Sequence, residues 1–166
     1  SYNNSEIAKP LNGNKRLGLC MIVKNEEKNL KRCLNSVIDL ADEIIIVDTG
    51  STDNTKIIAE QYGTNYYSYE WSNDFSEARN FSLDKAEAEW ILVLDADEEL
   101  SSDSSILLLD SINSSSIDAY SVKVKNLLAE NSFSGNDFFF LTRLFKNKKG
   151  YCYEGIVHEQ IKNSVL

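Results

Sequence analysis

Residues 90–100 read WILVLDADEEL, in which five large apolar residues run directly into a segment where four of five side chains are carboxylic acids. A continuous apolar run is typical of a strand that is covered on both faces, as in a parallel sheet. The acids behind it are close enough along the chain to repel one another unless something holds them together. This stretch therefore predicts a buried strand with a charged site at its carboxyl end.

The chain before residue 90 alternates between strand and helix patterns. Apolar runs of strand length are followed by segments in which apolar residues recur at helical spacing. The strand-like runs are residues 16–23, 42–50 and, more weakly, 64–70, and the helical segments are 24–40, 51–63 and 74–89. This rhythm predicts an α/β fold with a mostly parallel sheet.

The rhythm changes after the quoted stretch. A serine-rich segment, 101–118, contains one short apolar helix, and residues 119–128 alternate as a strand should. Residues 138–157 indicate two strands around the turn KNKKG. We therefore expect an antiparallel second half attached to the parallel first half, in a single domain that spans 16–166 and follows a flexible leader at 1–15.

The composition bounds the class of partner. With 166 residues, 42% of them hydrophobic, the chain is long enough for one domain with its own core. The formal net charge of -9 argues against a nucleic-acid polymer as partner, because proteins that bind one carry a basic face. An anionic small molecule would need a local cation or a few well-placed basic groups. The three cysteines form no CxxC pair, which favours reduced thiols.

The sequence shows no pattern for membrane insertion or secretion. No apolar stretch approaches the roughly 20 residues that a transmembrane helix needs. The polar first residues also lack the apolar core of a signal peptide. We therefore expect a cytoplasmic protein, and we leave open a peripheral position at the inner face of the membrane.

Two of the predicted strands end in aspartates, Asp48 and Asp95, and ligands of open α/β sheets bind beyond these carboxyl ends. On an extended chain, residues two apart face the same side, so Asp95 and Asp97 would converge. A divalent cation, Mg²⁺ or Mn²⁺, would relieve their repulsion and suits one or two carboxylates combined with substrate phosphates. We interpret Glu98 and Glu99 instead as charges at the start of the next helix, where they complement its dipole.

The segment VDTGSTDNT, which follows the second predicted strand, is typical of an entry into a helix. Gly50 suits a left-handed turn, Ser51 or Thr52 an N-cap, and Asp53 the first helical turn. Asp48 has no such structural task, which makes it a candidate binding residue. The segment lacks the three glycines of a dinucleotide fingerprint, and the chain has no GxxxxGK phosphate loop.

The segment DFSEARN, residues 74–80, begins like a capping box, with Asp74 at the N-cap and Glu77 three residues later. These two positions have a structural explanation in that motif. Arg79 lies one turn into the helix, where its guanidinium group could bind a phosphate bidentately or remain solvated at the surface. The motif alone leaves both interpretations open.

Taken in order, these segments resemble glycosyltransferase family 2, whose members have the GT-A fold, over roughly Leu17 to Ile161. MIVKNEE, VDTGSTDNT, DFSEARN and LDADEEL are similar to four family elements in register, and Thr49 replaces the second Asp of many members. YEGIVHEQI resembles the Gly-x-x-His-Glu segment of one subgroup. The resemblance implies a Rossmann-like, nucleotide-binding half with a mostly parallel sheet, and an antiparallel half on the acceptor side.

The resemblance also implies a chemistry: metal-dependent, inverting transfer of a sugar from a nucleotide-diphosphate donor, UDP-linked in our interpretation, with Mn²⁺ or Mg²⁺ as cofactor. It implies metal ligation by Asp97 and by His158, or a phosphate contact by that histidine. It implies that Asp48 and Asp53 contact the uracil or ribose. The remaining residues that it assigns to the nucleotide sugar are Asn25, Glu26, Gly50, Arg79 and Asp95.

The acceptor side is less determined. An inverting transfer needs a general base for the acceptor's proton, and the candidates are Glu154 and Glu159. Arg143, in TRLF, is left open between a contact to acceptor or phosphate and a surface position. The acceptor itself, whether glycan, lipid-linked or peptide, is open. We expect the full-length protein to continue beyond this C-terminus, where relatives carry acceptor-binding elements or helical repeats.

Three other classes of protein remain as alternatives. A nucleotide-sugar-binding module without activity would share the same site. A receiver-type signalling domain also gathers acids and Mg²⁺ at strand ends, but the antiparallel second half does not fit it. A nucleotidyltransferase would need a basic, glycine-rich loop after the first strand, and MIVKNEEKN is not one.

Overall fold

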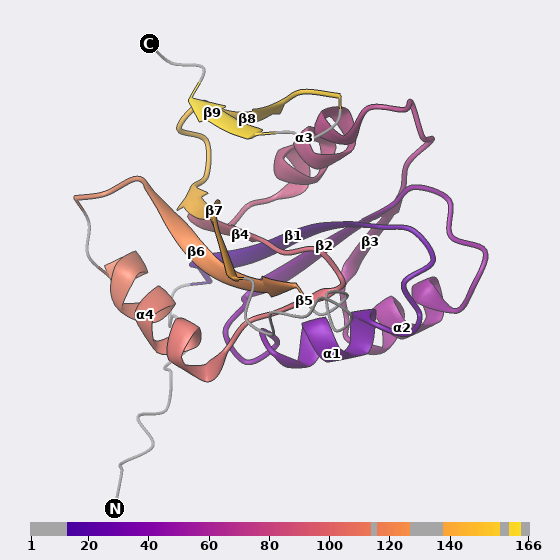
Figure 1. Ribbon diagram of the computed structural model, residues 1–166, viewed down its shortest axis with the longest axis horizontal. Helices are drawn as coiled ribbons and strands as arrows, with labels where there is room; N and C mark the ends of the chain where they lie inside the picture. Colours follow the sequence, from indigo (N-terminus) through magenta and orange to yellow (C-terminus); the bar gives the residue numbers. More distant parts are fainter. Residues whose placement is uncertain (1–12, 114–115, 127–137, 157–159, 164–166) are drawn as a thin grey trace, which may run out of the picture.

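The computed structural model describes residues 13–113, 116–126, 138–156 and 160–163. In these residues a seven-stranded sheet forms the central layer, in the order β3-β2-β1-β4-β7-β6-β5 (Figure 1). Its strands are β1 (Leu17–Val23), β2 (Glu43–Asp48), β3 (Asn65–Ser68), β4 (Trp90–Val93), β5 (Glu98–Glu99), β6 (Ala119–Asn126) and β7 (Phe138–Lys146).

Helices cover both faces of this sheet, which gives three layers (Figure 1). On one face lie α1 (Leu30–Asn35), α2 (Thr55–Gln61) and α4 (Ser102–Asn113). On the other face lie α3 (Phe75–Lys85) and a small separate hairpin of β8 (Tyr151–Glu154) and β9 (Gln160–Asn163). Covering both faces explains why the apolar runs of β2 and β4 are continuous rather than alternating.

Two hydrophobic clusters fill the spaces between the layers. Successive residues of β1 point to opposite faces, so Leu19 and Met21 join one cluster and Cys20 joins the other. The first cluster packs α1 and α4 onto the sheet through Leu34 and Leu108, among others. Cys20, Cys33 and Cys152 are free thiols, as expected, and the first two are buried.

The predicted division into two halves is confirmed. β1 pairs in parallel with β2 and β4, and β2 with β3, whereas β7 runs antiparallel to both β4 and β6. The helix predicted over 24–40 is shorter than expected, because residues 24–29 form a loop in which Asn25 has a positive φ of 57°. The two strands around KNKKG belong to different sheets, β7 to the central one and β8 to the hairpin.

The interpretation of Glu98 and Glu99 as helix-start charges is wrong. These residues form the short strand β5, which pairs antiparallel with β6, and α4 begins only at Ser102. The Glu98 side chain is buried against Arg143 rather than exposed in a first helical turn. A buried ion pair therefore determines the local structure here, and dipole complementarity does not.

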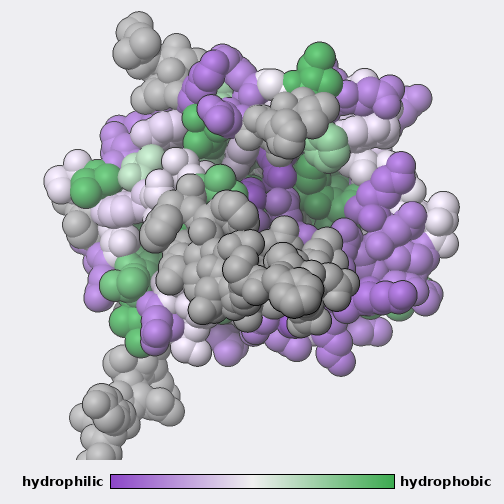
Figure 2. Space-filling view, in the orientation of Figure 1, coloured by the Kyte–Doolittle hydropathy of each residue, from purple (hydrophilic) through white to green (hydrophobic). Residues whose placement is uncertain are grey.

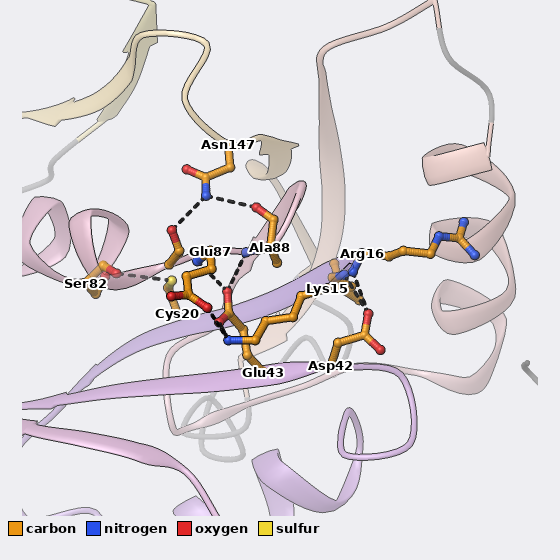
Figure 3. A network of polar contacts seen from close by, with 11 residues as sticks. Lys15, Arg16, Cys20, Asp42, Glu43, Ser82, Glu87, Ala88 and Asn147 are labelled. Atoms are coloured by element: carbon orange, nitrogen blue, oxygen red, sulfur yellow. Dashed lines mark hydrogen bonds and ion pairs between the residues drawn. The ribbon is translucent and has the colours of Figure 1, made fainter. Parts of the chain in front are cut away.

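The strands β1, β2 and β4 begin on the same side of the sheet, which we call the amino edge. There the side chain of Glu43 links β2 to the segment before β4 and to Lys15 (Figure 3). Its Oε1 accepts hydrogen bonds from the backbone N–H groups of Glu87 and Ala88 at 2.8 and 2.6 Å, and its Oε2 lies 2.9 Å from Lys15 Nζ. Gly18 leaves room for this side chain, since a Cβ at that position would lie 3.0 Å from Glu43 Oε1. Lys15, the last residue of the predicted leader, is thus anchored to the domain.

The visible surface is mixed. In the space-filling view, hydrophobic residues form small separate spots between hydrophilic ones (Figure 2). Single exposed apolar side chains such as Ile57 and Ile106 are ordinary for a globular domain. Among the described residues, no helix has the length and hydrophobicity needed to cross a membrane.

Candidate active site

A cleft of about 840 Å³ opens at the edge where β1, β2 and β4 end, which we call the carboxyl edge. Its described walls come from seven elements and their loops: the ends of β1, β2 and β4, the start of α3, and parts of β7, β8 and β9. Lys24, Thr49, Phe75, Arg79 and Asp97 are among the lining residues. The predicted position of the site, beyond the carboxyl ends of the parallel strands, agrees with this cleft.

Asp95 lies in the cleft between two arginines. Its Oδ1 is 2.8 Å from Arg79 Nη2, and its Oδ2 is 3.0 Å from Arg143 Nη2. Burial alone would raise the pKa of Asp95, but the two guanidinium groups outweigh it and hold that pKa below the ordinary value. The protein itself therefore neutralises the first acid of the DADEE segment.

Arg143 also pairs with Glu98, whose Oε1 lies 2.9 Å from the same Nη2 atom. Both side chains are only 9% exposed. The surface position that the sequence left open for Arg143 is therefore wrong. The available signal was a charged residue within the apolar strand FFFLTRLF, which is costly to bury unless it has a partner.

Asp97 differs from its neighbours. Within the described part of the chain it makes no ion pair, although it is half-buried and lines the cleft. Burial and the nearby charge of Asp95 raise its pKa. The two aspartates do reach one cleft, but not by facing the same side of an extended strand: β4 ends at Val93, and Asp97 lies in the following turn.

Asn25 joins the loops that follow β1 and β2. Its backbone N–H donates to Ser51 Oγ at 2.8 Å, and its side-chain Oδ1 accepts from the N–H of Thr52 at 2.8 Å. The N–H of Glu26, a residue of the cleft wall, donates to Thr55 Oγ1 at 2.7 Å. The structure thus joins Asn25 and Glu26 to the second loop, and of the two only Glu26 is among the residues that line the cleft.

Asp53 lies just before α2 rather than in its first turn. Its Oδ1 accepts from the backbone N–H of Thr55 at 3.0 Å, and its Oδ2 from the N–H of Glu27 at 3.2 Å. The N-cap position is Asn54, so the assignment of Ser51 or Thr52 as N-cap is wrong by two or three residues. Asp53 fastens one loop to the other while it prepares the helix.

Asp48 does have a structural task, contrary to the argument from sequence. Its Oδ1 accepts hydrogen bonds from the N–H groups of Gly50 and Ser51 at 2.8 and 2.7 Å, and its Oδ2 accepts one from the Tyr66 hydroxyl. Gly50 has the predicted left-handed conformation, with φ of 107°. Asp48 is buried and shapes the loop, and it is not among the residues that line the cleft.

The helix α3 begins as predicted. Asp74 Oδ1 accepts from the N–H groups of Ser76 and Glu77, whereas the Glu77 side chain accepts from Ser72 Oγ and does not complete the capping box. Arg79 is buried in the cleft wall, with its guanidinium carbon 5.4 Å from the centre of the Tyr153 ring. The alternative of a solvated surface arginine is therefore wrong.

The structure does not bring Glu154 to the cleft. This residue, at the end of β8, has a side chain that is 54% exposed and forms an ion pair with Lys162 at 2.7 Å. His158 and Glu159, the other two candidates from the same segment, lie outside the described residues. Asn80, which the sequence argument did not use, ties α3 to β8 through hydrogen bonds to both backbone groups of Tyr153.

The described part of the cleft offers a divalent cation few protein ligands. No group of three or more His, Cys, Asp or Glu side chains suited to a metal occurs among the described residues. Of the described carboxylates that line the cleft, Asp95 pairs with two arginines and Glu26 accepts a hydrogen bond from the side-chain amide of Asn29, whereas Asp97 has neither kind of contact. The residues fit a cation that takes one protein carboxylate and draws other ligands from phosphates and water, as Mg²⁺ often does.

These features define the class of the domain: a parallel half covered by helices, an antiparallel extension and an acid-lined cleft are those of the GT-A fold. Solved structures of S. aureus TarS, residues 1–349, share it. One has a TM-score of 0.55 at 20% identity and covers 80% of this chain and 47% of that chain. Another, in complex with UDP-GlcNAc, has a TM-score of 0.54 at 25% identity and covers 63% and 33%.

The sequence profile of Glycosyl transferase family 2 matches residues 19–157, and the chain belongs to that family. It is 39% identical over 152 residues to a TPR repeat-containing protein of Synechococcus elongatus, and 34% identical over 145 residues to the glycosyltransferase SunS of Bacillus subtilis. These alignments cover 91% and 86% of this chain, but 36% and 34% of the relatives. The chain thus spans about a third of their length. Membership of the Gly-x-x-His-Glu subgroup stays a prediction.

Proposed function

We propose that this domain binds a UDP-linked sugar in the cleft at the carboxyl edge and transfers the sugar to an acceptor with inversion. The observation that carries the proposal is Asp97, a half-buried carboxylate that faces the cleft of a family 2 domain without an ion pair among the described residues. A complex of TarS with UDP-GlcNAc, 25% identical to this chain, supports the choice of a uridine donor.

In this proposal Asp97 holds Mn²⁺ or Mg²⁺ together with the donor's diphosphate. The cation, when bound, stabilises the negative charge that develops on the leaving diphosphate. Arg79 adds positive charge to the same wall of the cleft, and Asp95, held by both arginines, would contact the ribose. This arrangement also explains how a chain with a net charge of -9 accepts an anionic donor.

The joined loops after β1 and β2 form the nucleoside end of the proposed site. Asn25 and Glu26 would contact the donor from one loop, and Gly50 from the other. Asp48 and Asp53, whose oxygens already accept backbone hydrogen bonds, would act mainly by fixing the shape of that loop. We keep His158 as a metal or phosphate contact and Glu159 as general base, whereas the exposed ion pair of Glu154 gives it no support.

Thermal unfolding in the presence of nucleotide sugars tests the proposal. Donor at 100 times its dissociation constant should add about 2.7 kcal/mol to the stability, which is roughly 5–10 °C in Tm for a domain of this size. We expect this rise for a UDP-sugar with Mn²⁺, and loss of its Mn²⁺-dependent part in Asp97→Ala. Asp110→Ala, on the exposed side of α4, serves as the control.

Two results would contradict the assignment. If no UDP-sugar raises Tm, the cleft is not a donor site. If the Mn²⁺-dependent shift is equal in the wild type and Asp97→Ala, Asp97 is not the metal ligand. Hydrolysis of the bound donor, followed by release of UDP, separates an enzyme from a nucleotide-sugar-binding module without activity. We expect slow hydrolysis that requires Mn²⁺ or Mg²⁺.

A further inference from the structure

The turn between β4 and β5 carries Asp95 and Asp97, and hydrogen bonds between Glu98 and Asp95 hold its two ends together. Glu98 Oε2 accepts a hydrogen bond from the backbone N–H of Asp95 at 2.8 Å. In return, the backbone N–H of Glu98 donates to the carbonyl oxygen of Asp95 at 2.9 Å. Two reciprocal bonds therefore fix residues 95 and 98 relative to each other, and Asp97 lies between them.

Arg143 fastens this turn to the sheet. Its Nη2 lies 2.9 Å from the second oxygen of Glu98 and 3.0 Å from Asp95 Oδ2. Arg143 directly precedes Leu144 on β7, which pairs with Leu92 near the end of β4, so it stands on the central sheet. Glu98 thus uses one oxygen to close the turn and the other to hold the arginine that also orients Asp95.

The helix α1 supports the turn at both ends. Cys33 Sγ lies 3.5 Å from the carbonyl oxygen of Asp95, and burial raises the pKa of this thiol to about 12, so that it stays protonated and can donate. Ser36 Oγ accepts from the N–H of Leu100 at 3.1 Å. None of these bonds involves the side chain of Asp97, so within the described residues they fix its position through the backbone of the turn.

We propose that Glu98, acting with Arg143, is the positioning residue of this cleft: it sets the turn that presents Asp97 and fixes Asp95, and so determines how tightly donor and metal bind together. The inference rests on the proposed function, because it concerns the same site. Residues that orient a metal ligand usually matter for affinity, with losses of about 10- to 100-fold when they are changed.

Glu98→Gln is the substitution that isolates this role. The amide has nearly the shape of the carboxylate but carries only one oxygen. Its NH₂ group would face either the N–H of Asp95 or the guanidinium group of Arg143, donor against donor. The turn or the arginine must therefore move, although the volume of the buried side chain is preserved.

Glu43→Gln provides a matched control at the amino edge (Figure 3). Glu43 is also a buried glutamate that accepts backbone N–H groups with one oxygen and pairs with a cation through the other. Its replacement meets the same conflict between donors, but on the opposite edge of the sheet from the cleft. Both variants therefore lose the charge of a buried glutamate, but only Glu98→Gln loses it beside the cleft.

The first measurement is amide hydrogen exchange of the free protein. We expect Glu98→Gln to speed exchange of the Asp95 N–H at least tenfold relative to the wild type, while the amides of Glu87 and Ala88 stay protected. Glu43→Gln should show the reverse. Unchanged protection of Asp95 in Glu98→Gln would overturn the positioning role, and this result does not depend on any ligand.

The second measurement is the dissociation constant of UDP at saturating Mn²⁺. We expect a weakening of about 10- to 100-fold in Glu98→Gln and less than twofold in Glu43→Gln. Equal losses in both variants, or none in Glu98→Gln, would overturn the inference. If Glu98→Gln does not fold, Glu98→Asp keeps the charge but shortens the reach, and it should show the same loss.

The two parts of the account fail in distinguishable ways. If the wild type binds no UDP, the proposed function is wrong, and hydrogen exchange alone decides whether Glu98 fixes the turn. If the wild type binds UDP and Glu98→Gln binds it equally well, the proposed function survives, and the positioning role of Glu98 is contradicted.

Discussion

The amino edge and the carboxyl edge of the central sheet share one structural feature but differ in what surrounds it. Each places a buried glutamate, Glu43 or Glu98, that accepts a backbone hydrogen bond and pairs with a cation. At the amino edge both oxygens of Glu43 have partners, and the exposed Glu87 is also paired with Lys15 (Figure 3). At the carboxyl edge Asp97 remains outside the network. This difference is what the proposed function requires, namely one edge that stabilises the fold and another that has a carboxylate for a ligand.

The cations of the two edges also differ in their exposure. The side chain of Lys15 is 34% exposed, whereas that of Arg143 is 9% exposed and faces two carboxylates. Solvent screens the first pair, and the second is screened much less. The contribution of each pair to stability should therefore be very unequal.

Arg143→Met should have the largest effect. It leaves Glu98 buried without its cation, and loss of one partner of a buried pair costs about 3–5 kcal/mol. Lys15→Met should cost only about 0–1 kcal/mol, because that ion pair is partly exposed and Glu43 keeps its two backbone donors. Urea unfolding of both variants measures the contrast. Equal losses would mean that the two edges do not differ as described.

Asp95→Asn should have an intermediate effect that depends on pH. Loss of the charged hydrogen bonds to the two arginines should cost about 2 kcal/mol at pH 7. Because the folded-state pKa of Asp95 lies below its unfolded value, this contribution is complete above about pH 5 and is lost as pH falls below about 4. Urea unfolding between pH 3 and 7 checks it. A difference between wild type and variant that stays constant over this range would refute the pairing.

Asp97→Asn should have the smallest effect on stability, and of the opposite sign. The raised folded-state pKa means that ionised Asp97 opposes folding at neutral pH, and this penalty disappears as pH falls below its unfolded pKa. Since the side chain is partly solvated, we expect a gain of roughly 0.5 kcal/mol at pH 7 without metal. A loss of stability in differential scanning calorimetry would show that Asp97 has a structural partner.

Much of the fold follows from the sequence because its signals are local. The apolar runs of β2 and β4 and the N-cap at Asp74 depend on neighbours within a few residues, and all are found as predicted. The short α1 was overestimated, since its helical spacing continues through the turns after Asn35. Periodicity records which face is buried, and it does not fix where a helix ends.

The site was predicted less completely because its contacts are distant in sequence. Glu98 and Arg143 are 45 residues apart, so no spacing rule connects them. The structural role of Asp48 was missed because the sequence around an aspartate at a strand end does not show whether its carboxylate binds a ligand or, as here, two backbone amides of the following loop. Asp95, which shares the cleft with Asp97, is neutralised by arginines from α3 and β7, and composition alone cannot distinguish this from neutralisation by a metal.

The most direct test of the account is calorimetric titration of Mn²⁺ into the protein with and without UDP. Because the account assigns a single protein carboxylate, Asp97, to the cation, Mn²⁺ alone should bind weakly and UDP should strengthen its binding at least tenfold. Asp97→Asn should lose that gain while its fold and its Glu98–Arg143 pair remain. Tight, UDP-dependent binding of Mn²⁺ by Asp97→Asn would contradict the central claim.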